Sequence, residues 1–157
     1  MSPKLPKRPA LSPEEAQAGA ERIVAHMLEK DGFSRWLGIS VTVIAPAKST
    51  CTLTVRPEML NGFGVCHGGV TFALADSAFA FASNTQGNVA MSIDNQISYP
   101  APARLGDVLT ATAREESGSD RLAFYRVEVH NQLGALIAMF KGTVYKTRTP
   151  HLPEDGA

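Results

Sequence analysis

The chain has 157 residues, 44% of them hydrophobic, which is enough to bury the core of one domain. Lysine plus arginine equals aspartate plus glutamate at 15 each, so the formal net charge is zero and nucleic acid is not an expected partner. No run of about 18 apolar residues occurs, so no membrane-spanning helix is predicted.

The cysteine pattern and the N-terminal composition predict a cytoplasmic protein. Cys51 and Cys66 form no CxxC pair and belong to no set of cysteines and histidines at metal-ligand spacing. We therefore expect two free thiols in a reducing compartment and no bound metal. Residues 1–11 interleave prolines with basic residues and no apolar stretch follows, which predicts a flexible arm and not a secretory signal.

The first predicted helix covers about residues 12–30. Ser12 is its N-cap, Pro13 takes the first helical position, and Glu15 completes a capping box. Apolar residues recur behind this start at helical spacing, which predicts one buried stripe. They are Ala16, Ala20, Ile23 and Met27. Asp31-Gly32 ends the helix, and a short turn is expected over residues 33–37.

From Gly38 onward the apolar residues alternate, which is typical of strands. An antiparallel pair is predicted around residues 39–43 and 51–55, and Pro57 ends its second strand. After Gly87 come further strand-like segments, separated by turn signals. They cover roughly residues 88–99, 107–116, 121–131 and 135–147, and residues 148–157 are expected to form a flexible tail.

Residues 68–84, between these two groups of strands, are apolar with almost no polar face. A helix that is apolar all round is a buried helix. The order of elements predicts the α+β class with an antiparallel sheet and not alternating βαβ units. One sheet curled around this helix would explain why it has no solvated face. We find no internal repeat and no second domain.

Asp76 lies in the middle of this apolar helix. An ionised carboxylate buried without partners costs several kcal/mol or has a raised pKa. The residue is therefore either satisfied by local donors or an ion pair, or used in chemistry, and we favour the chemical role.

Cys66-His67-Gly68-Gly69 leads into the same helix. Amides of a first helical turn lack helical acceptors and carry the positive end of the helix dipole. Two glycines let a ligand atom approach this backbone closely, which indicates an oxyanion hole for an acyl carbonyl. A tight turn without function is the alternative. His67 is a candidate general base, or a turn residue bonded to the local backbone.

The spacing of these two features predicts a site shared between subunits. Gly68 and Asp76 are eight positions apart, or about 12 Å along a helix axis, so one carbonyl cannot easily contact both. Gly68 of one helix is expected to face Asp76 of a partner packed antiparallel to it. Ser77 points away from its neighbour Asp76 and no GxSxG motif is present, so a Ser–His–Asp triad is not predicted.

Several segments carry a resemblance to a known family. They are Asn61-Gly62, Cys66-His67-Gly68-Gly69, Leu74-Ala75-Asp76-Ser77-Ala78-Phe79-Ala80, Asn84, and Gly106-Asp107-Val108-Leu109-Thr110-Ala111-Thr112-Ala113. Together they resemble the hotdog-fold acyl-CoA thioesterases of the phenylacetate-degradation (hydroxyphenylacetyl-CoA thioesterase) type. The resemblance implies a sheet wrapped around one long buried helix over residues 12–147. It implies dimers joined edge to edge, usually paired into homotetramers, that hydrolyse acyl- or aryl-CoA with no metal and no cofactor apart from the CoA of the substrate.

The resemblance also implies roles for individual residues. Asp76 would be the nucleophile or general base, and the Gly68 N–H would polarise the thioester carbonyl. Asn61 would orient the carbonyl or the attacking water, and His67 would shape the turn. The expected substrate-binding residues are Gly69, Phe63, Ser77, Tyr99 and Arg104. Phe63 stands where a polar residue is common in the family, and Tyr99-Pro100 where a basic residue before proline is common.

Two other functions stay open on the residues alone. A hydratase or dehydratase of the same fold would use His67 and Asp76 as its acid and base. A non-catalytic acyl-CoA-binding regulator would need a partner-binding module, and the 12–30 helix carries no basic face for one. The sequence does not name the acyl group. The phenylalanines at 63, 72 and 79 and Tyr99 are candidates to line an aromatic pocket, with core packing as the alternative.

Overall fold

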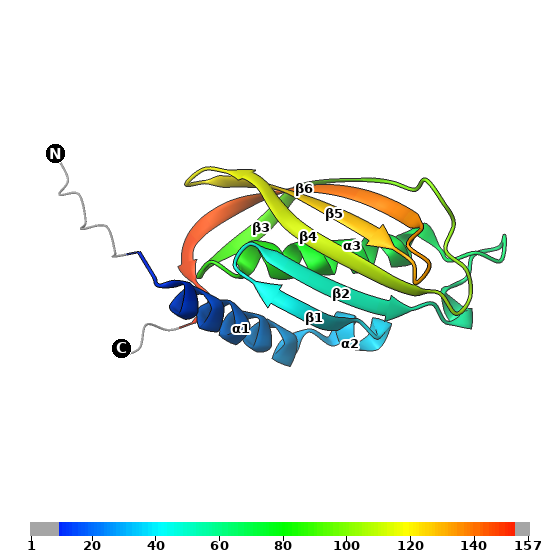
Figure 1. Cartoon of the computed structure of the whole chain (residues 1–157), viewed down its shortest axis with the longest axis horizontal. Coiled ribbons are helices and arrows are strands. Elements are labelled where there is room, and N and C mark those ends of the chain that lie inside the picture. The colour runs from blue at the N-terminus through cyan, green and yellow to red at the C-terminus, as the bar shows by residue number, and fades with distance from the viewer. Residues whose placement is uncertain (1–9, 153–157) are drawn as a thin grey trace.

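The structure is a computed structural model that describes residues 10–152 (Figure 1). Residues 1–9 and 153–157, which include parts of the predicted arm and tail, lie outside the described residues. The helices are α1 (Pro13–Lys30), α2 (Gly32–Leu37) and α3 (Gly68–Asn84), with a 3-10 turn at Pro57–Met59. The strands are β1 (Ser40–Ala45), β2 (Lys48–Thr54), β3 (Asn88–Ser98), β4 (Val108–Gly118), β5 (Leu122–His130) and β6 (Leu136–Pro150).

One six-stranded sheet with the order β1-β2-β4-β5-β6-β3 contains all these strands. Every neighbouring pair is antiparallel, and β1 and β3 are the two edges. The sheet curls around α3, which contacts all of the strands (Figure 1). This arrangement confirms the predicted α+β fold, an antiparallel sheet wrapped around one long helix.

The face of α3 toward the sheet is fully buried and made mainly of small or apolar residues. Phe79 lies on this face, and its ring packs against Tyr125 and Phe140 at centroid distances of 5.6 and 5.4 Å. Gly142 of β6 lies beneath the ring, where an added Cβ would come within 2.6 Å of it. Phe79 is therefore part of the core.

The opposite face of α3 is less buried than the sequence predicted. Gly69 is exposed, and Ala73, Asp76 and Ala80 are half-buried. One curled sheet covers one side of a helix, so the side away from the sheet is incompletely covered within a single chain.

The predicted capping box of α1 is confirmed. The Glu15 amide donates to Ser12 Oγ at 3.2 Å, and the Ser12 amide donates to Glu15 Oε2 at 2.8 Å. The helix lies along the edge strand β1 (Figure 1), and Gln17 Nε2 donates to the Ile44 carbonyl of that strand at 2.8 Å.

Two segments differ from the sequence prediction. The expected turn after α1 is a six-residue helix, α2, which ends at Gly38 with φ of 81°. Strand β6 continues to Pro150, paired with Asn88, so residues 148–150 are strand and not loose tail. The end of β6 is fixed by His151, whose ring bonds Asn84 Oδ1 at 2.5 Å and whose amide donates to the Gly87 carbonyl. These long-range bonds leave no periodic signal in the sequence.

Candidate active site at the start of helix α3

The turn that opens α3 leaves one amide available to an external oxygen. His67 is the N-cap, and its Nδ1 accepts the Gly69 N–H at 2.9 Å. The Val70 N–H donates to the His67 carbonyl. Within residues 10–152 the Gly68 N–H donates to no acceptor. It points from the positive end of a 17-residue helix and is suited to bind a carbonyl oxygen or an oxyanion.

His67 acts here as a structural cap of the turn. Because Nδ1 accepts the Gly69 N–H, the neutral ring carries its proton on Nε2. The His67 amide also donates to the Met59 carbonyl at 2.8 Å, which joins the turn to the loop before it.

Tyr99 supports the same turn from the loop after β3. Its hydroxyl donates to the Gly68 carbonyl at 2.9 Å. A Cβ on residue 68 would lie 3.2 Å from the Tyr99 ring. Gly68 has no positive φ, so close packing against Tyr99, and not backbone conformation, is what favours glycine at this position.

Asn61 closes the loop that precedes the turn. Its Oδ1 accepts the amides of Phe63 and Val65 at 2.9 and 3.4 Å, so only Nδ2 is left to contact a substrate. Phe63 projects from the tip of this loop and is 91% exposed. Arg104 is also exposed, and its backbone amide donates to Asp107 Oδ2 at 2.8 Å.

Asp76 is held by a donor from the edge strand β3. Asn95 Nδ2 donates to Asp76 Oδ1 at 3.1 Å, and Ser92 Oγ donates to Asn95 Oδ1 at 2.9 Å. Burial raises the pKa of the half-buried Asp76 carboxyl, and the Asn95 hydrogen bond opposes that rise. Desolvation makes the carboxylate more basic, while Asn95 stabilises its ionised form.

Sequence reasoning missed Asn95 and Ser92. A strict alternation places residues three apart on opposite faces of a strand. The register of β3 shifts between Ser92 and Asp94, so Ile93 is an extra residue and both polar side chains reach the helix side. The signal available in the sequence was the need of a buried carboxylate for a nearby donor.

The predicted residues thus fall into two groups on α3. His67, Gly68, Gly69 and Tyr99 meet at its first turn. Asp76 lies two turns further along, as the spacing predicted, and its neighbour Ser77 lies 3.5 Å from Ser34 of α2. Among the described residues, no hydrogen bond joins Phe63 or Arg104 to either group.

Two cavities of about 340 and 330 Å³ flank the first turn of α3. Gly68, Tyr99 and residues 100–103 line the first, and His67, Gly69 and α2 line the second. Among residues 10–152 no group of three or more histidine, cysteine or acidic residues could hold a metal ion. No helix in this part of the chain has the length and apolar character needed to cross a membrane.

Comparison with known proteins identifies the family. The thioesterase superfamily model matches residues 63–138. The acyl-coenzyme A thioesterase PaaI of Escherichia coli is 38% identical over 120 residues, which cover 76% of this chain and 86% of that protein. Human acyl-coenzyme A thioesterase 13 is 34% identical over 125 residues, which cover 77% of this chain and 89% of that protein.

Comparison of the fold with solved structures identifies the same family as the sequence comparison. The structure of the E. coli PaaI protein from the phenylacetic acid degradation operon aligns with a TM-score of 0.84 at 34% identity, covering 86% of this chain and 98% of that chain. The chain therefore belongs to the thioesterase superfamily, among the hotdog-fold acyl-CoA thioesterases of the PaaI type.

Proposed function

We propose that the protein hydrolyses aryl-acyl-CoA thioesters, such as phenylacetyl- or hydroxyphenylacetyl-CoA, to the free acid and CoA. Asp76 is the nucleophile or general base, and the Gly68 N–H is the oxyanion donor. The observation that carries the proposal is the pairing, on one helix, of two groups. One is an amide at the positive end that has no acceptor among residues 10–152, and the other is a half-buried carboxylate held by Asn95.

These groups are sufficient for thioester hydrolysis. As general base, the Asp76 carboxylate takes a proton from water while the water oxygen attacks the thioester carbonyl carbon. The carbonyl oxygen becomes an oxyanion that accepts the Gly68 N–H. Collapse breaks the C–S bond, and the CoA thiolate takes the proton back from Asp76. An oxyanion donor is typically worth about 10²–10³ in rate and a positioned base about 10²–10⁴.

As nucleophile, Asp76 would instead form a mixed anhydride and expel CoA thiolate, and water would then hydrolyse the anhydride. Both routes need the Asp76 carboxylate ionised and the thioester carbonyl bound at the Gly68 N–H, so both require the same positions of these two groups.

We place the site between two copies of the chain, joined along β3. Asp76 is held by Asn95 of this edge strand, so the carboxylate lies at the boundary where a second chain would add. Met91 and Ile93 of β3 are 59% and 58% exposed in the single chain. A partner helix running antiparallel brings Gly68 of one copy opposite the partner's Asp76. The homodimer, paired further into a homotetramer, is thus part of the proposal.

We also propose a cytoplasmic location for the protein, on the basis of its two free cysteine thiols. Cys51 and Cys66 are free and buried, and burial raises the pKa of Cys51 to about 12. Both therefore stay protonated and unpaired in a reducing compartment.

A hydratase receives less support from the geometry than a hydrolase. The Nδ1 of His67 is occupied by the Gly69 amide, and the ring caps the helix two turns away from Asp76. His67 and Asp76 of one chain therefore form no acid–base pair, and across the proposed interface only Nε2 of His67 is left for proton transfer. A regulator would need a second module, and residues 10–152 form one domain.

The test is Asp76→Asn, which keeps the size of the side chain and removes the base. We expect kcat for phenylacetyl-CoA, measured by release of the CoA thiol, to fall roughly 10²–10⁴-fold with the fold retained. Asp94→Asn is the matched control, because Asp94 is an exposed carboxylate on the same strand as Asn95. Turnover of Asp76→Asn within twofold of wild type would contradict a catalytic role for Asp76. Hydration of an enoyl-CoA without release of the CoA thiol would favour the hydratase.

A further inference from the structure

We propose that the cavity of about 330 Å³ between α2 and the first turn of α3 is the acyl pocket, and that Trp36 and Glu58 make it selective for aryl groups. Trp36 stacks on the ring of the acyl group, and Glu58 accepts a hydrogen bond from a ring hydroxyl. The inference rests on the proposed thioester hydrolysis and names the residues that select its substrate.

The cavity shares its floor with the oxyanion turn. His67, Gly69, Val70 and Ala73 line it, and all of them lie within the first turns of α3 next to the Gly68 N–H. A thioester has two arms that leave its carbonyl carbon, and one cavity lies on each side of this turn. An acyl group whose carbonyl oxygen binds Gly68 can therefore extend into one cavity while the CoA arm takes the other direction.

Aromatic side chains of α2 form the wall that suits a ring. Phe33 and Trp36 line the cavity, with ring centroids 6.0 Å apart and an interplanar angle of 40°. They are 55% and 70% exposed, whereas Ser34 and Leu37 of the same helix are buried. Small-molecule sites are typically lined by apolar and aromatic side chains with a few polar groups, and their volumes begin near 300 Å³.

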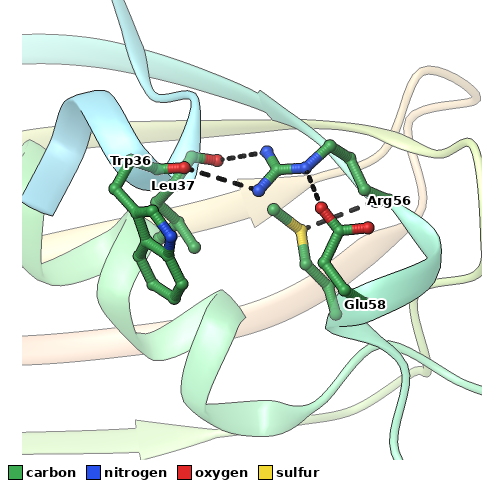
Figure 2. A network of polar contacts seen from close by, with 5 residues as sticks. Trp36, Leu37, Arg56 and Glu58 are labelled. Carbon is green, nitrogen blue, oxygen red and sulfur yellow. Dashed lines mark hydrogen bonds and ion pairs between the residues drawn. The ribbon is translucent and has the colours of Figure 1, made fainter.

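Arg56 fixes this wall in place (Figure 2). Its Nη1 donates to the Leu37 carbonyl at 2.7 Å and its Nη2 to the Trp36 carbonyl at 3.4 Å. These are the last carbonyls of α2, which ends at Leu37 and is followed by the C-cap Gly38, so the guanidinium adds a second cap to the helix C-terminus. Trp36 is thus held on a fixed backbone and is ready to receive a ring without rearrangement of the helix.

Glu58 supplies the polar group at the rim. Arg56 Nε donates to Glu58 Oε1 at 2.6 Å, and this hydrogen bond lowers the pKa of the Glu58 carboxyl. In Figure 2 the Glu58 carboxylate lies across the view from the Trp36 indole, and both residues line the same cavity. An ionised carboxylate only accepts hydrogen bonds, so it favours a ring that carries a hydroxyl over an unsubstituted ring.

Trp36 is the single tryptophan of the chain, so its fluorescence reports directly on this cavity. The slow variant Asp76→Asn is titrated with phenylacetyl-CoA, with butyryl-CoA and with CoA alone. We expect a saturable fluorescence change with phenylacetyl-CoA and none with CoA alone. A change of equal size with CoA alone would overturn the inference, because the CoA arm would then occupy the cavity.

Kinetics give a second readout that does not depend on fluorescence. Trp36→Ala should lower the ratio of kcat/KM for phenylacetyl-CoA to that for butyryl-CoA by about tenfold. Glu58→Gln should lower the preference for para-hydroxyphenylacetyl-CoA over phenylacetyl-CoA by about tenfold. Phe124→Ala is the matched control, since Phe124 is an exposed aromatic residue of β5 that does not line the cavity, and it should leave both ratios within twofold.

Ratios that stay at the wild-type values in both Trp36→Ala and Glu58→Gln would overturn the inference. That result differs from a failure of the proposed function. If thioester hydrolysis is wrong, the wild type releases no CoA thiol from any of these substrates. If only the pocket assignment is wrong, the wild type is active, Asp76→Asn is not, and the ratios do not move.

Discussion

Replacing Asn95 with alanine removes the hydrogen bond that this side chain donates to Asp76 Oδ1 at 3.1 Å. Burial raises the pKa of Asp76, and Asn95 is the group that opposes the rise. A donor to a carboxylate favours the charged form, so its loss raises the pKa of Asp76 further. The base works only when it is ionised, and the acid limb of the kcat/KM profile should therefore move to higher pH.

The size of the effect of Asn95→Ala depends on how exposed to water the Asn95–Asp76 hydrogen bond is. A hydrogen bond to a charged group contributes about 1.5–3 kcal/mol net. Asp76 is half-buried, so water replaces part of the lost bond and the lower value applies. About 1.5 kcal/mol corresponds to a shift of the acid limb by roughly one pH unit, so kcat/KM on that limb should fall roughly tenfold.

The assay is the pH dependence of CoA thiol release by wild type and Asn95→Ala. Gln96→Ala is the matched control, because Gln96 is the next residue of β3, is exposed, and pairs with Lys141 on the sheet. The control should keep the wild-type profile. An unmoved acid limb in Asn95→Ala, or an equal shift in Gln96→Ala, would show that Asn95 does not position or tune Asp76.

The other predictions concern the turn, the assembly and the stability of the fold. Gly68→Ala places a methyl 3.2 Å from the Tyr99 ring and should displace the oxyanion donor, lowering kcat by roughly 10²–10³-fold. Tyr99→Phe keeps the ring and loses only the hydroxyl bond to the Gly68 carbonyl, so its loss should be milder. If Gly68→Ala is silent and His67→Ala inactive, the amide is not the donor. Sedimentation should show a dimer or tetramer, and mixing Asp76→Asn with Gly68→Ala subunits should restore part of the activity; an active monomer contradicts the shared site. Because the folded state raises the pKa of Asp76, that carboxyl favours folding at low pH, and this contribution is lost as pH rises through the raised pKa. Asp76→Asn should therefore have a higher Tm than wild type at pH 7, with the difference vanishing in acid, and a lower Tm at pH 7 would refute the desolvation argument.

Features that depend on local sequence were predictable. The capping box of α1 needs only Ser12 and Glu15, three residues apart, and the structure confirms it. The bounds of α3 match the predicted 68–84 because the apolar run, the glycines before it and Gly87 after it are all local signals. The succession of strands along the chain followed from turn residues between alternating segments, and the structure confirms it.

Features that depend on long-range register were not predictable. The extra residue Ile93 in β3 brings Ser92 and Asn95 to one face, and no periodicity rule gives its position. The aromatic wall came from Phe33 and Trp36, in a segment expected to be only a turn, because a six-residue helix is too short to show a stripe. Phe79 was ambiguous between pocket and core until Gly142 was placed beneath its ring.

The position of α1 along β1 limits how far the sheet can grow by addition of further chains. A sheet with two bare edges can take up strands at both ends and extend into an open fibre. Here the Gln17 side chain bonds the backbone of β1 and α1 lies along that edge, which leaves β3 as the edge to which another strand can add. Once β3 is paired with β3 of another copy, the combined sheet ends in a helix-covered strand on both sides and growth stops. In the proposed dimer the N-terminal helix would therefore limit further strand addition, and its loss would leave β1 open to a strand of another chain.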